Sequence, residues 1–133
     1  MAVQLSVAAR NARLDSIETT IGTSAVMKIF SGSPPANCAA ADTGTVLATL
    51  NLPSDWMAAA SGGSKALSGT WQDLSADNTG TAEHFRVYDS GVTTCHIQGT
   101  VGTSGTDMTV NSTSFTAGQS FTVNSFTLTD GNA

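Results

Sequence analysis

EHFRVYDSGVTTCHIQGTV, residues 83–101, predicts two β-strands joined by a turn. In its first seven residues Phe85 and Val87 point to one side, and His84, Arg86 and Tyr88 to the other, which is the alternation of a strand. Asp-Ser-Gly follows as a turn signal, because Asp bonds its own backbone and Gly tolerates unusual dihedral angles. The last ten residues alternate more weakly but contain Val and Thr, which favour strands. We therefore expect a β-hairpin here.

The rest of the chain extends this β pattern. Segment 32–44 is predicted to be a loop, because its Pro-Pro pair cannot sit in a central strand, and 54–64 is either one helical turn or a loop. Strands recurring about every 8–12 residues are typical of a sandwich or barrel. We predict a single domain over residues 1–133, mainly β: a β-sandwich or jelly-roll-like barrel, with an N-terminal α-helix at 3–21 and a β domain at 25–133. Further strands are predicted at 25–31, 45–52, 65–73, 107–112, 114–116 and 119–129.

The helix at 3–21 is predicted from apolar side chains that recur at steps of three and four residues. Gly22 follows as a helix C-cap residue. A helix of this length is marginal alone in water, so its apolar stripe packs either on the chain's own sheet or on a partner subunit. Two arginines in the same segment would suit an acidic partner surface. The candidate partner-binding residues are Val3, Val7, Arg10, Arg13, Leu14, Ile17 and Ile21.

The charge balance excludes several classes of partner. Charged residues make up 11% of the chain, and 5 Lys and Arg against 10 Asp and Glu leave a net charge of −5. Nucleic acids and anionic membranes attract clustered positive charge, which this chain lacks. No stretch approaches the roughly 20 apolar residues of a membrane helix, and the N-terminus lacks the pattern of a secretory signal. Because weakly charged surfaces promote association, we expect a homo-oligomer, a dimer or trimer.

Cys38 and Cys95 are the two cysteines. Two thiols do not form a structural zinc site without further ligands at suitable spacing. We expect two separate buried thiols, since free Cys is often buried. A disulfide remains an alternative if the fold brings their Cα atoms within about 7 Å, and a reactive thiol is a third.

Potential catalytic and metal-binding side chains show no specific spacing. His84 and His96, on neighbouring predicted strands, could hold a metal together with Asp89, yet polar strand faces carry His routinely. No nucleophile motif accompanies them. The acidic stretch at 73–78 lacks the Gly and distal Glu of a calcium loop. We predict no enzyme activity, no catalytic, cofactor-binding or metal-binding residue, and no cofactor.

The aromatic residues raise the question of a sugar-binding surface. Trp56, Trp71 and Tyr88 could form a platform on which sugars stack. Aromatics make up only 6% of the chain, so the fold needs most of them for its core. We therefore expect these three side chains to be core residues.

The whole-chain pattern resembles a family of small proteins encoded by tailed phages and prophages. The segments that carry the resemblance are AVQLSVAARNARLDSIETTIG, PPANCAAADTGTVLATLNLPSDWMAAASGG, GTWQD, HFRVYD, TTCHIQGTVG and SFTLTDGNA. The resemblance implies a virion-associated structural protein without catalytic residues. We expect a capsid cement or decoration protein that is made in the host cytoplasm and binds the major capsid protein on the outer capsid surface. A tail- or neck-associated protein or a receptor- or sugar-binding module is the alternative, and a virion-associated hydrolase is a third.

Overall fold

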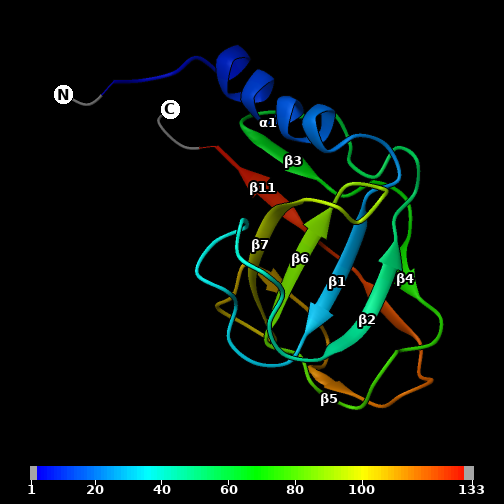
Figure 1. Ribbon diagram of the computed structural model, residues 1–133. Coiled ribbons are helices and arrows are strands. Elements are labelled where there is room, and N and C mark those ends of the chain that lie inside the picture. The colour runs from blue at the N-terminus through cyan, green and yellow to red at the C-terminus, as the bar shows by residue number, and fades with distance from the viewer. Residues whose placement is uncertain (1–2, 131–133) are drawn as a thin grey trace.

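The computed structural model describes residues 3–130, which contain one helix and eleven short strands. The helix comes first in the chain and every strand follows it (Figure 1). Their bounds are α1 (Val7–Ile21), β1 (Val26–Phe30), β2 (Val46–Asn51), β3 (Ser64–Ala66), β4 (Trp71–Asp73), β5 (Gly80–Thr81), β6 (His84–Tyr88), β7 (Cys95–Gly102), β8 (Met108–Thr109), β9 (Ser114–Phe115), β10 (Phe121–Val123) and β11 (Thr127–Thr129).

Five of the strands form one sheet, in the order β2-β1-β6-β7-β8. The β6–β7 hairpin is the one predicted from 83–101, and β6 occupies the central position. Adjacent strands run antiparallel, except that β7 and β8 are parallel. In the antiparallel register Tyr88 lies opposite Cys95, with an irregularity after Val87. Side chains opposite each other point to the same face, so Tyr88 and Cys95 share one side of the sheet.

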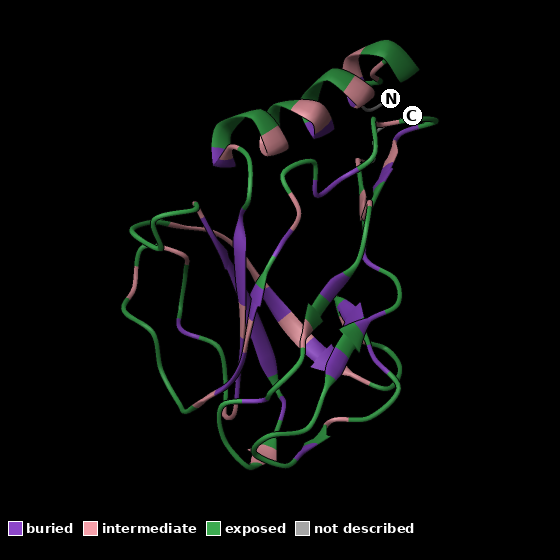
Figure 2. Cartoon of the chain, turned by 90° about the vertical axis from the view of Figure 1, so that its right-hand side faces the viewer, coloured by how far each residue is buried: buried purple, intermediate pink, exposed green. Residues whose placement is uncertain are grey.

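The remaining strands form three pairs, β10-β4, β11-β3 and β5-β9. The hydrophobic core lies between these pairs and the five-stranded sheet. Trp71 of β4 contacts the ring of Phe126, and Phe126 packs edge-on against Phe85 of β6, at centroid distances of 5.3 and 5.5 Å. Figure 2 shows buried strand segments facing one another across this interior. The chain is thus mainly β with an N-terminal helix and a curled sheet, as predicted, and is sandwich- or barrel-like.

Both faces of β6 are buried. Phe85 and Val87 lie in the core, as their alternation predicts. The opposite face is covered by the connection between β1 and β2, residues 31–45, which we call the covering loop. This loop lies over the sheet in Figure 1, and its carbonyl groups accept hydrogen bonds from the Arg86 side chain of β6 and the Gln98 side chain of β7. A third layer, made of loop, therefore lies outside the sheet.

The helix α1 begins at Val7, so the prediction of a helix from residue 3 is wrong at its start. The side chain of Ser6 accepts a hydrogen bond from the backbone N–H of Ala9 at 3.1 Å, which is the N-cap interaction that sets the first turn. The other end agrees with prediction: Gly22 has φ +91° and its N–H donates to Glu18 O at 2.8 Å. In Figures 1 and 2 the helix lies across one end of the β strands.

Other expected boundaries also change. Of the two alternatives for segment 54–64, the loop is the one that forms; there Trp56 is fully buried and its indole N–H donates to Gly22 O at 2.9 Å. The strand expected at 65–73 is two strands, β3 and β4, and the one expected at 119–129 is also two, β10 and β11. Within residues 3–130 no helix is both long and apolar enough to cross a membrane.

Candidate functional site

The helix α1 is held on the β strands by buried charge as well as by apolar contact. Lys65 of β3 is 1% exposed. Its ammonium group donates to Asp15 Oδ1 at 2.6 Å, to Glu18 Oε1 at 2.9 Å and to Ala58 O at 3.0 Å. Burial by itself lowers the pKa of Lys65, but the hydrogen bonds to the two carboxylates outweigh it and raise that pKa above its usual value. Helix and strand are therefore joined by a three-membered ionic cluster.

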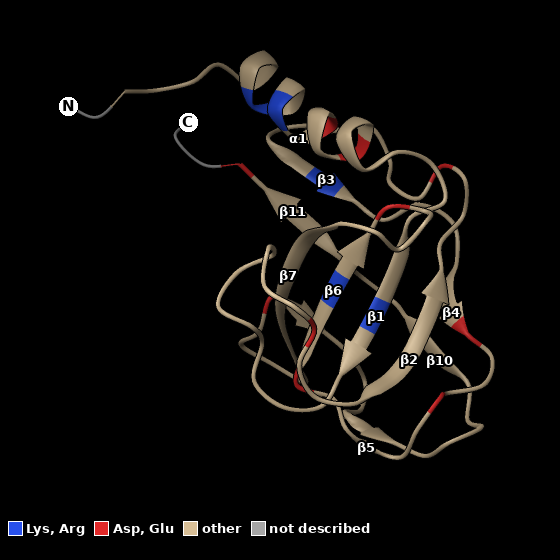
Figure 3. Ribbon diagram, viewed as in Figure 1, with Lys and Arg blue, Asp and Glu red and all other residues tan. Residues whose placement is uncertain are grey.

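A second polar contact lies one turn earlier in the helix. Arg10 is 8% exposed and donates to Gly62 O at 3.1 Å. The N–H of Gly63 donates to Asn11 Oδ1 at 2.9 Å. Arg13 pairs with Asp130, with Nε and Oδ2 3.1 Å apart. Figure 3 shows the basic part of α1 and the basic residue of β3 on facing elements. Arg10 is thus committed to the chain's own β layer, whereas the Arg13 side chain remains 60% exposed beside its ion pair. The expectation that these arginines meet an acidic partner surface stays a prediction.

The candidate partner-binding residues fall into two groups. Leu14 and Ile21 are buried and Ile17 packs against the core, so these three use the chain's own β layer as their surface. Val3 and Val7 are exposed, at 82% and 51%. The apolar stripe is thus divided: its later part packs within the chain, and its first part remains open to contact.

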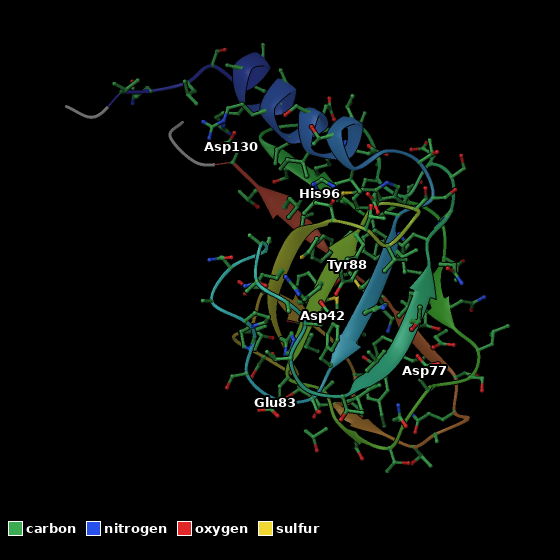
Figure 4. All side chains as sticks on the ribbon, viewed as in Figure 1. Asp42, Asp77, Glu83, Tyr88, His96 and Asp130 are labelled. Atoms are coloured by element: carbon green, nitrogen blue, oxygen red, sulfur yellow. The ribbon has the colours of Figure 1, made fainter. Side chains whose placement is uncertain are left out.

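A second cluster lies beneath the covering loop and centres on Arg86, which is 1% exposed. Its guanidinium group is paired with the carboxylate of Asp42 and donates to Cys38 O at 2.8 Å and to Ala40 O at 2.9 Å. Asp42 also accepts the hydroxyl of Tyr88 at 2.5 Å, and Figure 4 shows these two side chains pointing toward each other. Burial, with this hydrogen bond to a carboxylate, raises the pKa of Tyr88 well above its usual value.

The ends of the covering loop are fixed by three further contacts. Gly32 N donates to Glu83 Oε2 at 2.7 Å, and the carbonyl of the same glycine lies 2.6 Å from His84 Nδ1. His84 is fully buried and stacks on Phe30, with centroids 4.8 Å apart. Gln98 donates to Pro35 O at 2.8 Å. These polar side chains are occupied in holding the loop.

The two cysteines lie in this cluster and are free thiols. The expectation of two separate buried thiols is wrong, because Cys38 of the loop and Cys95 of β7 are both half-buried and line one cavity. They line a cavity of about 350 Å³ together with Asp42, Arg86 and Tyr88. Burial and the neighbouring Cys38 raise the pKa of the Cys95 thiol to about 11.

The structure separates the two histidines. His84 lies opposite Thr100, whereas His96 lies at the irregularity between Ile97 and Cys95, at the other end of the strand pair. The metal arrangement considered for both rings with Asp89 is therefore not formed. Within residues 3–130 no three His, Cys, Asp or Glu side chains are grouped as metal ligands.

The aromatic residues and the acidic stretch at 73–78 both serve the fold. Trp56 and Trp71 are fully buried in the hydrophobic core, as expected. Tyr88 is also buried, at 5% exposed, but lies beneath the covering loop and outside that core, so the three form no exposed platform. In the acidic stretch, Asp73 accepts the N–H of Thr49 at 2.9 Å, and Asp77 accepts the Thr49 hydroxyl at 2.8 Å. These carboxylates tie β4 and the following turn to β2.

Neither polar cluster was predicted from the sequence. Lys65 lies in a short strand with no apolar alternation, and nothing near it in sequence indicates that it meets the helix. The cluster at Arg86 had a weak signal: a charged side chain on the polar face of an alternating strand. Comparisons of the chain with protein-family models, with curated proteins and with solved structures give no match.

Proposed function

We propose that this chain is a non-enzymatic structural protein of a phage virion, a cement or decoration protein that binds the major capsid protein and reinforces its lattice. The whole-chain resemblance to small phage proteins supports a virion role. The structural observation that carries the proposal is the division of the N-terminal stripe. The helix α1 is held on the β strands by buried polar contacts. The apolar side chains of Val3 and Val7, at and just before its N-terminus, remain exposed.

Two exposed apolar side chains lie at that end of the chain. Among the described residues, four large hydrophobic side chains are exposed, and Val3 and Val7 are two of them. Figure 1 shows the segment before α1 leading away from the β strands. An apolar contact of this kind, on a chain with 11% charged residues, suits an interface core, where Lys and Glu are depleted. The N-terminal segment and first helical turn would thus form the contact with the capsid.

Three polar side chains of types that can take part in catalysis are used to hold the fold, which supports a structural role. Lys65 holds the helix, Arg86 holds the covering loop, and His84 is stacked and hydrogen-bonded beneath that loop. Each of these three groups is at most 1% exposed. They stabilise the fold, as expected of a protein that acts by shape.

Fractionated particles test the proposal. Heads and tails from purified virions that contain this chain are separated, and its copies are counted against the major capsid protein by quantitative mass spectrometry. A cement protein is expected in the head fraction at a fixed, high ratio. Recovery from tails alone overturns the capsid proposal and supports the tail-associated alternative.

A pair of matched variants tests the surface. Val3→Asp with Val7→Asp places charge on the proposed contact, and Leu74→Asp does the same at a side chain that is 69% exposed on the turn after β4. All three positions are exposed, so both proteins should keep the melting temperature of the unchanged chain. We expect the first protein to lose head binding at least tenfold and the second to bind normally. Equal binding by both would show that the N-terminal end is not the contact.

A further inference from the structure

We infer that Cys38 and Cys95 form an intramolecular disulfide site, which closes when the folded protein meets a disulfide donor such as glutathione disulfide and locks the covering loop onto the sheet. This inference concerns the chemistry of the chain itself and is independent of the proposed virion role.

The register and the loop contacts bring the two thiols together. Cys95 lies opposite Tyr88, so its side chain points to the face of the sheet that the covering loop occupies. Cys38 is held over that face because its carbonyl accepts a hydrogen bond from Arg86 at 2.8 Å. The two cysteines consequently line the same cavity, although they come from segments far apart in sequence.

The site is also open to a reagent. Both cysteines are half-buried, not enclosed, and they line one cavity of about 350 Å³. The turn after β6, including Val92 and Thr93, forms part of the same wall. The guanidinium group of Arg86 is close enough to Cys95 to favour its thiolate. A small disulfide can thus reach both cysteines from one cavity.

The reaction balances as two thiol–disulfide exchanges. The Cys38 thiolate attacks a sulfur of glutathione disulfide, the S–S bond breaks, and one glutathione leaves as thiolate. The Cys95 thiolate then attacks the Cys38 sulfur, and the second glutathione leaves. The two protein thiols lose two electrons and two protons, and the donor becomes two glutathione molecules. The same balance holds if Cys95 reacts first.

Equilibration of the full chain in glutathione redox buffers tests the site. Intact mass reports the fraction of protein that has lost two hydrogen atoms. Iodoacetamide labelling reports the fraction in which neither cysteine can be alkylated. The disulfide should form in the monomer, with an equilibrium constant roughly a hundredfold larger for folded protein than for the same chain in guanidinium chloride. By linkage, the oxidised protein should melt about 10 °C higher than the reduced protein.

Single-cysteine variants provide the control. Cys38→Ser and Cys95→Ser should each stop at a glutathione adduct on the remaining cysteine, and neither should lose two hydrogens or gain thermal stability. Three results overturn the inference: glutathione adducts that persist on the unchanged chain, disulfides only between two chains, or equal equilibrium constants in the folded and unfolded states. Each means that the fold does not bring the two sulfur atoms together.

Discussion

Lys65 donates a hydrogen bond to Asp15 over 2.6 Å, and this pair joins the buried side of β3 to the helix α1. The two ends of the pair differ: the Lys65 side chain is 1% exposed, whereas that of Asp15 is 46% exposed. The buried ammonium group has lost its water, so its hydrogen-bond partners must compensate for the lost hydration. The carboxylate of Asp15 remains in contact with water.

This asymmetry predicts which of two substitutions lowers the free energy of unfolding more. Lys65→Met keeps the aliphatic stem and removes the buried charge, so its cost should be small. Asp15→Asn with Glu18→Gln keeps the shapes but leaves the ammonium group buried without a counter-charge, so its cost should be larger. Urea denaturation of the three proteins at pH 7 compares the free energies of unfolding. Greater destabilisation by Lys65→Met would contradict the assignment of Lys65 as the dependent partner.

Arg86→Leu should release the covering loop. The substitution leaves three loop carbonyls without their donor and Asp42 without its counter-charge, although that carboxylate is 39% exposed and still accepts the Tyr88 hydroxyl. Each lost hydrogen bond of this kind costs about 1 kcal/mol. Limited proteolysis should then cut within 31–45, where the unchanged chain is protected. Arg13→Leu removes an arginine that is 60% exposed and is the control, with the loop still protected. Equal protection in both variants would mean that other contacts hold the loop.

Gly63 lies directly beneath Arg10. Its φ is +78°, and a Cβ atom there would lie 1.8 Å from Arg10 Nη2, whereas a Cβ on Gly62, at φ +60°, meets nothing within 4 Å. Gly62→Ala should cost only the left-handed backbone strain, about 1 kcal/mol. Gly63→Ala should cost about 1–2 kcal/mol more, because the buried arginine must move. Differential scanning calorimetry of both variants measures the difference, and equal melting temperatures would contradict the contact.

The free energy of unfolding should fall at alkaline pH as the Cys95 thiol loses its proton. Its pKa is raised from 9.0 to about 11, so the unfolded chain loses this proton at lower pH than the folded chain. The contribution is fully present below about pH 9 and is lost as pH rises through 11. The groups around the thiol are Cys38, Arg86, Tyr88 and Asp42. Urea midpoints between pH 8 and 11 should fall less steeply for Cys95→Ser than for the unchanged chain. Parallel curves would remove Cys95 as the cause.

Local pattern predicted much of the fold because local rules decide those features. The alternation around Phe85 and Val87 placed these residues in the core, and Gly22 marked the helix end. The helix start was missed because Val3 extended the apolar spacing past Ser6. The hydrogen bond from Ala9 N–H to the Ser6 side chain, not apolar spacing, determines where the first turn forms.

The sequence by itself determined the strand-rich class, the central hairpin and the helix that precedes it, since these follow from spacing over a few residues. Tertiary structure alone decided which polar residues are buried. Lys65 meets Asp15 across 50 positions, and Arg86 meets Cys38 across 48. No local pattern records such encounters, because a side chain's hydration and ionisation depend on which distant segment covers it. The covering loop buries Arg86 and brings Cys38 to Cys95, and both effects exist only once the sheet has formed.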